Sequence, residues 1–303
     1  MEYEPDRGQE TTPELEVVIV SHGAWDLLSR CLGSLRRHPP SVKTQVTVVD
    51  SGSTDETPDL VAAHFPEVRL VRLGNVGFSA SNNVALEAGE APMVLLLNPD
   101  TEVHEGSIDA SIEALATHPE AGMVGIKLVT PDGSLDHACK RSFPTPLAAL
   151  GHLTGIGRTD EAPSALSQYR ATDLGDDEAG EVDAINGAYM LVRREAIDQV
   201  GPLDEGYWMY GEDLDWCHRF WDAGWQVRYE PSGVALHVKG GTSDGIRSPS
   251  QEIAFHRAMG RFYRRYEAPN RFLGLNLLVY LGIGLRLLTR LIRASAADRR
   301  SGA

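Results

Sequence analysis

Short apolar segments alternate with helical patterns through the first 130 residues, and this alternation limits the fold more than any other feature of the sequence. Leu15–Val20 is an almost continuous run of apolar, mostly β-branched residues, which is typical of a parallel strand buried on both faces. A helical stripe follows and stops at Pro39 and Pro40. Further strand patterns begin at Val46, Val68, Met93 and Ala121. The alternation predicts βαβ units, and therefore an α/β fold with a mostly parallel sheet flanked by helices.

The connections between these strands carry weaker local signals. Ser53 and Glu56 have the spacing of a capping box, which predicts that a helix begins there. Val84–Leu86 predicts the start of a further helix after two glycine-containing turns. Pro131–Ser134 is predicted as a turn. Residues 151–181 show no clear periodicity and are predicted as a mobile loop that forms a lid.

Three carboxylates lie in the predicted first turn of an aromatic-rich helix, namely Glu212, Asp213 and Asp215. Acidic side chains there interact favourably with the helix dipole, by about 0.3 to 1 kcal/mol each. Asp215 also has an ordinary partner in Arg219 four residues later, so we predict a structural role for it. Glu212 and Asp213 directly follow the aromatic segment Tyr207–Gly211, which suits a pocket wall. A carboxylate in such a place can act as a general base on a hydroxyl.

Acidic residues also stand at the ends of two predicted strands. Asp50 closes the second strand, and MVLLLNPDTEV predicts a strand whose carboxyl end delivers Asp100. Either residue alone fits an ordinary turn or cap. The carboxyl ends of parallel strands meet at one edge of a sheet, so the two together fit a nucleotide and a divalent cation with oxygen ligands. His237, taken alone, is predicted as a packed or surface histidine.

The net charge of −15 is unevenly distributed along the chain. Residues 256–303 hold ten arginines against two carboxylates and carry +8, so the first 255 residues carry −23. An acidic body argues against nucleic-acid binding, whereas a basic tail requires an anionic partner. The three cysteines are widely spaced and indicate neither a disulfide framework nor a zinc site. The acidic N-terminus lacks the basic and then apolar order of a signal peptide, so we expect a cytoplasmic protein.

The C-terminal tail combines apolar and basic residues. Phe272–Leu285 is a run of 14 uncharged residues with arginines on both sides. A membrane-spanning helix needs roughly 20 apolar residues, so we predict an amphipathic helix that lies on an anionic membrane surface. The alternative is a helix packed on the enzyme body. The predicted organisation is a polar N-terminal tail over residues 1–13, one domain over 14–250 and a basic helical tail over 251–303.

Taken in this order, the segments resemble the family-2 glycosyltransferases of the GT-A fold, and above all their bacterial rhamnosyltransferase-like members. The resemblance spans Leu15–Ser243, about three-quarters of the chain. It rests on six segments in sequence, which are VVIVSHGAWDLLSRCLGSL, VVDSGSTDET, GNVGFSASNNVAL, LLLNPDTEV, NGAYMLVRREAIDQVGPLDEGYWMYGEDLDWCHR and HVKGG. Each segment alone is weakly diagnostic, whereas the six together are specific.

The resemblance implies a role for each candidate site residue. It makes Asp213 the general base, with Glu212 as the competitor for that role. It makes Asp100 the counterpart of the metal-binding aspartate of the family's DxD motif, with His237 as a further ligand of Mg²⁺ or Mn²⁺. The residues implied at the nucleotide-sugar donor are Ser21, Asp50, Ser53, Asp55, Asn75, Gly77 and Asn82. The sequence departs from the family's pattern at two places. The first strand ends in Ser-His-Gly, and NPD replaces the full DxD motif.

The implied activity is an inverting, metal-dependent transfer of a sugar, such as rhamnose from dTDP-rhamnose, to a saccharide or polyprenyl-linked acceptor. Such an enzyme would make cell-envelope polysaccharide and would lie on the cytoplasmic face of the membrane. Two other readings remain open. A sugar nucleotidyltransferase also uses acids at strand ends and a metal, although it requires a glycine-rich phosphate loop after the first strand, where this chain has VSHGAWDLL. An inactive protein that binds sugar nucleotides is the second.

Overall fold

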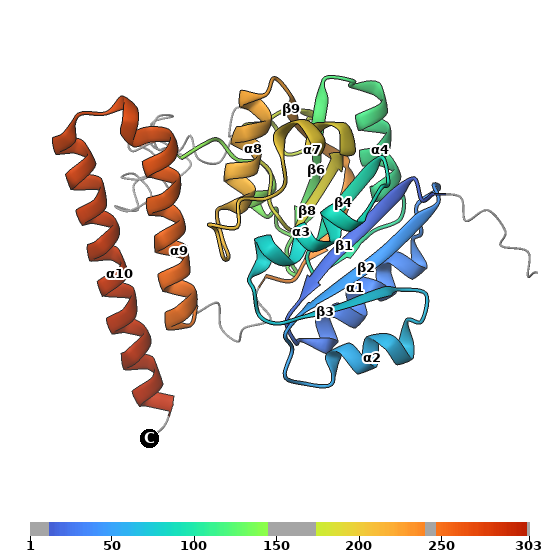
Figure 1. Cartoon of the computed structure of the whole chain (residues 1–303), viewed down its shortest axis with the longest axis horizontal. Coiled ribbons are helices and arrows are strands. Elements are labelled where there is room, and N and C mark those ends of the chain that lie inside the picture. Colours follow the sequence, from blue (N-terminus) through green and yellow to red (C-terminus); the bar gives the residue numbers. More distant parts are fainter. Residues whose placement is uncertain (1–11, 145–173, 240–246, 302–303) are drawn as a thin grey trace, which may run out of the picture.

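The structure is a computed structural model that describes residues 12–144, 174–239 and 247–301 (Figure 1). The strands are β1 (Leu15–Ser21), β2 (Thr44–Ser51), β3 (Arg69–Leu73), β4 (Met93–Leu97), β5 (Thr101–Val103), β6 (Ala121–Val129), β7 (Gly180–Glu181), β8 (Tyr189–Arg193) and β9 (Gln226–His237). The α-helices are α1 (Trp25–Arg37), α2 (Thr57–His64), α3 (Phe78–Ala88), α4 (Ser107–Thr117), α7 (Arg194–Val200), α8 (Glu212–Asp222), α9 (Pro249–Phe262) and α10 (Leu273–Ser301). Shorter helical turns lie at His137–Cys139, Tyr263–Glu267 and Ala268–Asn270. Most of the loop predicted at 151–181 lies outside the described residues.

Within the described residues, nine strands form one sheet in the order β3-β2-β1-β4-β8-β6-β9-β5, with β7 beside β9. Helices flank this sheet, which confirms the predicted α/β fold (Figure 1). Strands β3, β2, β1 and β4 are all parallel. Every residue of β1 is buried, as its apolar run predicts. The register places Ser21 opposite Asp50 at the carboxyl ends of β1 and β2.

Two local predictions between the strands are wrong. The capping box does not form. The Ser53 hydroxyl donates to Asp50 instead, and Glu56 is itself the N-cap residue of α2, with no hydrogen bond from a side chain to cap the helix. Helix α3 begins at Phe78 rather than at Val84. Its first turns bury small polar residues, so the apolar pattern used for the prediction starts too late.

The segment from Met93 to Val103 forms two strands instead of one. β4 ends at Leu97, and β5 pairs antiparallel with β9 after a turn at Asn98–Asp100. Strand β8, which no sequence pattern indicated, lies antiparallel between β4 and β6. The β5–β9 register sets Thr101 opposite His237, so Asp100 and His237 lie at the same end of neighbouring strands.

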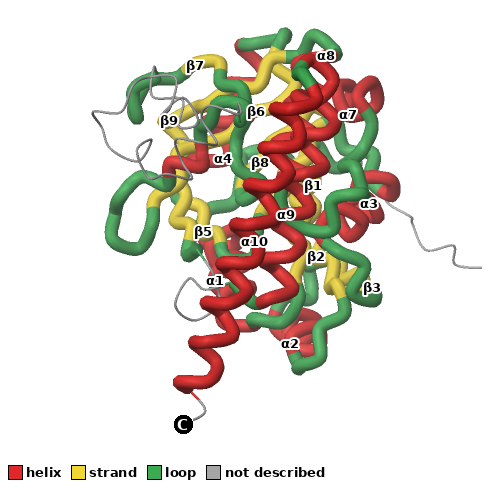
Figure 2. The backbone as a smooth tube through the Cα atoms, turned by 90° about the vertical axis from the view of Figure 1, so that its left-hand side faces the viewer, coloured by secondary structure: helices red, strands yellow, loops and turns green. Residues whose placement is uncertain are grey.

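The C-terminal helices form a pair beside the sheet, with α10 running back along α9 (Figures 1 and 2). The end of α9 is fixed to the body, because Phe262 and Tyr263 are buried and Arg261 forms an ion pair with Asp204 at 2.7 Å. The boundary predicted at residue 250 stays a prediction.

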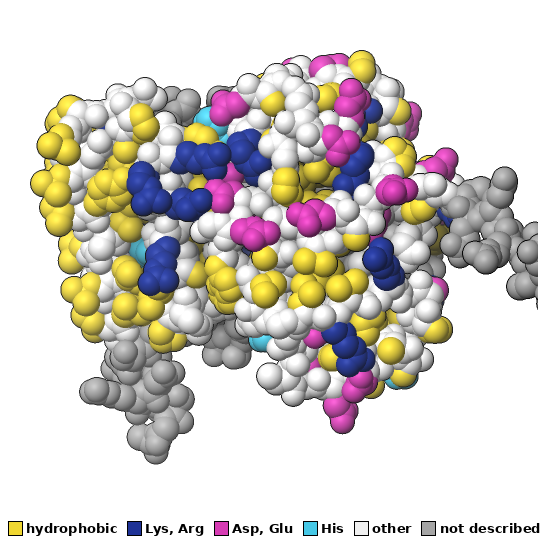
Figure 3. All heavy atoms as spheres, viewed as in Figure 1, with side chains coloured by type: hydrophobic (Ala, Val, Ile, Leu, Met, Phe, Trp, Pro, Cys, Tyr) yellow, Lys and Arg dark blue, Asp and Glu magenta, His cyan; other side chains and the backbone are white. Residues whose placement is uncertain are grey.

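Helix α10 leaves an apolar stripe on its outer side, where Figure 3 shows hydrophobic side chains. The exposed residues of this stripe recur at helical spacing and are Leu273, Leu277, Leu281, Leu285, Leu288 and Ile292. Among the described helices, only α10 contains a segment long and apolar enough to cross a membrane by length and composition, Leu273–Ile292, with a mean hydropathy of 1.6. In the sequence the uncharged run ends before Arg286, whereas the helix continues past that arginine.

Candidate active site

The carboxyl ends of β1 and β2 meet in a hydrogen-bonded cluster around Asp50, which is 4% exposed. Asp50 accepts a hydrogen bond from the Ser53 backbone amide at 3.2 Å and another from the Ser53 hydroxyl. The same hydroxyl accepts from the Gly23 amide at 2.6 Å, while Ser21 donates to the Gly23 carbonyl at 3.0 Å. The structure therefore brings together Ser21, Asp50 and Ser53, three of the residues expected at the donor.

Two further candidates lie on exposed loops beside this cluster. Asp55 is exposed and lies next to Gly23, whose missing side chain leaves room for the carboxylate. The exposed Asn75 lies on the loop after β3, and its backbone packs against Gly52. Gly52 has a φ of +77° and no space for a Cβ atom, so the two loops make close backbone contact. The two exposed side chains thus flank the Asp50 cluster.

Gly77 and Asn82 have structural partners at the start of α3. Gly77 has a φ of +97°, and a Cβ atom there would overlap the ring of Trp208. The Trp208 carbonyl also accepts a hydrogen bond from the Phe78 amide at 2.7 Å, so this glycine lets the aromatic segment dock on α3. Asn82 is 1% exposed, and its amide donates to the Phe78 carbonyl at 3.0 Å.

Asp100 and His237 come together, although they are far apart in the sequence. Asp100 Oδ1 lies 3.5 Å from His237 Nε2. On the other side of the ring, His237 Nδ1 lies 2.8 Å from Asp136, which also pairs with Lys239 at 2.5 Å. Burial opposes protonation of the imidazole, but the neighbouring carboxylates of Asp100 and Asp136 outweigh it and raise the pKa of His237 to about 9. Burial likewise opposes ionisation of Asp136, yet the bonds from His237 and Lys239 hold its pKa well below the ordinary value.

Unused oxygen atoms mark the turn that carries Asp100. In the described part of the chain, Asp100 Oδ1 and Asn98 Oδ1 are buried without a hydrogen-bond donor. Such oxygens suit a hard cation. Because Asp136 lies on Nδ1, Nε2 is the nitrogen left to bind a cation, and it must give up its proton to do so. Among residues 12–144, 174–239 and 247–301, no group of three or more His, Cys, Asp or Glu side chains is arranged to hold a metal. Asp100 and His237 therefore supply only part of a coordination sphere.

Asp213 is held at the N-terminus of α8 by a buried ion pair. Arg141 Nη2 lies 2.6 Å from Asp213 Oδ2, and the side chains are 9% and 12% exposed. The same oxygen accepts the Gly187 amide at 3.3 Å. The Arg141 guanidinium also donates to the Ile185 carbonyl at 2.5 Å. The carboxylate of Asp213 is therefore charge-balanced and fixed in direction, rather than free in a pocket wall.

Glu212 has the opposite environment to its neighbour. Its Oε2 is buried without a hydrogen-bond partner in the described part of the chain. Burial, and then the nearby charge of Asp213, raise the pKa of Glu212 well above its ordinary value. The two adjacent carboxyl groups thus have different surroundings, because Glu212 is buried without a partner while Asp213 lies against Arg141.

A short hydrogen-bonded path joins the acids of α8 to the turn that carries Asp100. Gly187 donates to Asp213, and the carbonyl of the next residue, Ala188, accepts the amide of Asn98 at 3.0 Å. β4 is also the parallel neighbour of β1, whose end carries Ser21. Asp213 and the β4–β5 turn therefore lie close together, beside the strand whose end carries Ser21.

Asp215 is structural, as predicted, but its environment is not the exposed helix pair that the sequence indicated. Its side chain is fully buried. It accepts hydrogen bonds from Arg219 at 2.9 Å, Arg265 at 3.0 Å and the Tyr266 hydroxyl at 2.8 Å. Asp215 therefore ties α8 to the turn that follows α9.

Two residues of the site were missed by the sequence analysis. Arg141 and Asp136 lie in a stretch without clear periodicity, and neither belongs to a recognised motif. Their partners, Asp213 and His237, are distant in the sequence. The one available signal was a pair of basic residues, Lys140 and Arg141, in an acidic body, and it does not name a partner.

Comparison with known proteins agrees with the fold and the motifs. A family model described as "Glycosyl transferase family 2" matches residues 16–201. N-acetylglucosaminyl-diphospho-decaprenol L-rhamnosyltransferase of Mycobacterium tuberculosis H37Rv is 34% identical over 261 residues, which cover 81% of this chain and 82% of the relative. Rhamnosyltransferase WbbL of Escherichia coli K12 is 25% identical over 229 residues, which cover 73% and 82%.

A solved structure shows the same fold at low sequence identity. GalNAc-T7 with UDP, GalNAc and Mn²⁺ matches with a TM-score of 0.58 at 15% identity, over 84% of this chain and 50% of that chain. The GT-A fold inferred from the resemblance is confirmed. The two alternative interpretations, a sugar nucleotidyltransferase and an inactive sugar-nucleotide-binding protein, are not supported by these comparisons. The family model covers more than half of the sequence, and so the chain belongs to glycosyl transferase family 2 and is a glycosyltransferase.

Proposed function

We propose that this enzyme is an inverting rhamnosyltransferase that moves a sugar from dTDP-rhamnose to a saccharide carried on a polyprenyl diphosphate, in the synthesis of cell-envelope polysaccharide. Two relatives are named as rhamnosyltransferases, and the name of one includes a diphospho-decaprenol acceptor. The structural observation that carries the proposal is the Asp213 carboxylate, which Arg141 fixes beside the turn of Asp100.

A single displacement needs one base and no protein nucleophile. The acceptor hydroxyl attacks the anomeric carbon while the bond to the diphosphate breaks, and the hydroxyl proton passes to a carboxylate. Asp213 suits this role, because Arg141 balances its charge and sets its direction. The cysteines are poor nucleophiles, since all three are buried and burial raises the pKa of each thiol.

The donor is proposed to bind at the carboxyl ends of β1 and β2. Asp50 and Ser53 offer a fixed set of polar atoms to the base and ribose, and Ser21 holds the backbone that surrounds them. The exposed Asp55 and Asn75 flank this cluster, and Asp55 also accepts the Thr57 amide at 3.2 Å. Gly77 and Asn82 contribute by fixing the start of α3.

The residues at Asp100 fit a divalent cation, and the proposal places Mg²⁺ or Mn²⁺ there. Asp100 and His237 would hold it, and diphosphate oxygens and water would complete the coordination. When bound, such a cation neutralises the charge that develops on the leaving diphosphate. The Mn²⁺ in the structure of GalNAc-T7 supports this assignment.

Removing the metal, or a residue that holds or orients it, should lower transfer activity or the affinity for Mn²⁺ and leave the fold unchanged. Chelation is expected to abolish transfer and Mn²⁺ to restore it. Asp136→Asn should weaken the apparent Mn²⁺ affinity about 10- to 100-fold, because Asp136 orients the His237 ring rather than contacting the cation. Asp100→Asn should weaken it at least as much, whereas Asp132→Asn, in an exposed turn, should not. Full activity in the presence of chelator contradicts the metal assignment.

The proposal also places the enzyme on the cytoplasmic face of the membrane, held by α10. This helix lies along α9, so only its outer stripe is available to lipid, and that geometry favours a helix on the surface over a spanning one. Arg290 is exposed beyond the apolar run and suits anionic headgroups, contributing about 1 kcal/mol near such a surface, whereas Arg286 lies over the Phe255 ring of α9.

Binding to vesicles tests the role of the tail. The full chain is expected to bind vesicles rich in anionic phospholipid and to be partly released by salt, because headgroup contacts are screened. Truncation after Glu267 should remove this binding and leave a folded domain, since the turn through Tyr266 retains its contacts with Asp215. Equal binding of both forms to vesicles, or none by the full chain, means that α10 is only a packing element.

The donor assignment is tested by a panel of nucleoside-diphosphate sugars. Each is screened for binding and for slow hydrolysis in the absence of acceptor. The expected result is selective binding of dTDP-rhamnose. Selective binding of a nucleoside triphosphate together with a sugar phosphate instead indicates nucleotidyl transfer.

A further inference from the structure

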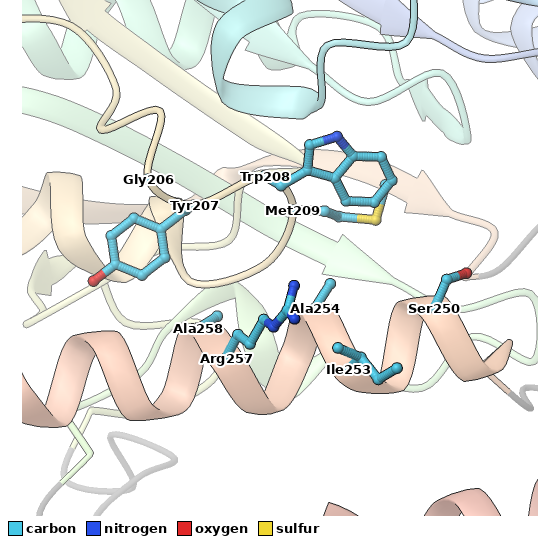
Figure 4. Close-up of a pocket in the computed structure, with 9 residues that line it drawn as sticks. All are labelled: Gly206, Tyr207, Trp208, Met209, Ser250, Ile253, Ala254, Arg257 and Ala258. Atoms are coloured by element: carbon cyan, nitrogen blue, oxygen red, sulfur yellow. The ribbon is translucent and has the colours of Figure 1, made fainter.

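A cavity of about 420 Å³ lies between the aromatic segment before α8 and the helix α9 (Figure 4). One side is formed by the segment 206–209, and the other by α9 from Ser250 to Ala258. In Figure 4 the side chain of Arg257 points from α9 towards the loop that carries Trp208. The volume is in the usual range of roughly 300 to 1,000 Å³ for small-molecule sites.

The cavity adjoins the proposed active site on two sides. Trp208 packs against Gly77, at the start of α3 on the donor side. Ala258 lies against Gly211, the residue directly before Glu212 and Asp213. The cavity therefore ends one residue before α8, on the side of the molecule where the basic tail begins, although neither Glu212 nor Asp213 lines it.

The lining combines apolar surface with one cation. Its apolar members are Trp208, Met209, Ile253, Ala254 and Ala258, and Trp208 is 42% exposed. Arg257 is the only lysine or arginine in the lining. In the described part of the chain Arg257 has no carboxylate partner, whereas Arg261 and Arg265 both pair with Asp204. Such a site is complementary to an anion joined to a hydrocarbon chain.

We propose that this cavity binds the diphosphate of the lipid-linked acceptor and the first isoprenoid unit, with Arg257 on the phosphate and with Ile253 and Met209 against the hydrocarbon. The inference rests on the proposed function and adds the subsite that recognises the carrier. It directs the acceptor sugar towards Asp213 and the lipid along α9 towards the exposed stripe of α10. Trp208 then forms the wall shared by donor and acceptor.

Binding of farnesyl diphosphate to the full chain, followed by calorimetry, tests the subsite without any sugar transfer. Arg257→Gln is expected to raise the dissociation constant about 10- to 100-fold, as for the loss of a charge-assisted hydrogen bond. Arg257→Lys should keep most of the affinity. The matched control is Arg264→Gln, an exposed arginine just beyond α9 that does not line the cavity, and it should bind as the wild type does. Farnesol should bind wild type and Arg257→Gln equally weakly.

Three results of the binding experiments would overturn the subsite. The first is equal affinity of Arg257→Gln and Arg264→Gln for farnesyl diphosphate. The second is that farnesyl diphosphate binds the wild type no more tightly than farnesol does. The third is that Arg257→Gln loses vesicle binding but keeps its affinity for farnesyl diphosphate. The last result assigns Arg257 to headgroups. Failure of the proposed function looks different, because the wild type then binds farnesyl diphosphate through Arg257 but transfers no sugar. If Arg257→Gln is active and its KM for the lipid acceptor is normal, the subsite is rejected while the proposed function stands.

Discussion

Replacing Asp213 by asparagine is expected to lower kcat for sugar transfer by about 10² to 10⁴, the usual contribution of a general base, while donor binding stays nearly unchanged. Asparagine keeps the size of the side chain and can still accept a hydrogen bond from Arg141, but it cannot take the acceptor proton. The measurement is single-turnover transfer together with donor affinity. The thermal midpoint of the variant checks that the loss of a buried charge has not unfolded the protein.

The adjacent glutamate supplies the matched comparison. Burial favours the protonated form of Glu212, so Glu212→Gln resembles the state already present and should retain most of the transfer activity. Successive helical residues point about 100° apart, so the two carboxyl groups cannot address one hydroxyl equally. Near-normal turnover in Asp213→Asn with a large loss in Glu212→Gln reverses the assignment.

Replacing Asp215 by alanine is expected to cost about 3 kcal/mol of stability, the low end of the range for breaking a buried ion pair. The change leaves Arg219 and Arg265 without their shared carboxylate and removes the acceptor of the Tyr266 hydroxyl. Arg265 is partly exposed, which places the estimate at the lower end. The urea midpoint measures the loss, and limited proteolysis should show faster cleavage after α9 as its anchor weakens.

Asp222 on the same helix is the control. It pairs with His218 at 3.1 Å at the same i to i+4 spacing, but its side chain is 63% exposed. Exposed helix pairs contribute only about 0.3 to 0.5 kcal/mol, so Asp222→Ala should hardly move the midpoint. Equal midpoints for Asp215→Ala and Asp222→Ala would show that burial of Asp215 adds nothing.

Local sequence patterns were sufficient for the elements that bury one continuous apolar surface. The parallel strands β1, β2 and β4 appear as apolar runs because both faces of these strands are covered. Helix α8 begins at Glu212 as predicted, since Gly211 and the acids of the first turn are local start signals. Asp50 and Asp100 could be identified as candidate site residues because they stand at the ends of predicted strands.

The rest depends on contacts between distant residues. Strand β8 pairs antiparallel with β4 and β6, and no local pattern states its direction or neighbours. The burial of Asp215 follows from Arg265 and Tyr266 in the tail, which the sequence presents as a separate extension. The ion pair of Asp213 with Arg141 likewise exists only after folding, so the sequence identifies the acid but not what fixes it.

Transfer of rhamnose from dTDP-rhamnose to N-acetylglucosaminyl-diphospho-polyprenol is the most direct test of the proposed activity. The full chain is incubated with both substrates and Mn²⁺, the lipid product is followed by mass spectrometry, and its new linkage is determined by NMR. The account predicts one added deoxyhexose with inverted anomeric configuration, and no product with Asp213→Asn. A retained configuration, or no product with this or any other nucleoside-diphosphate sugar, contradicts it.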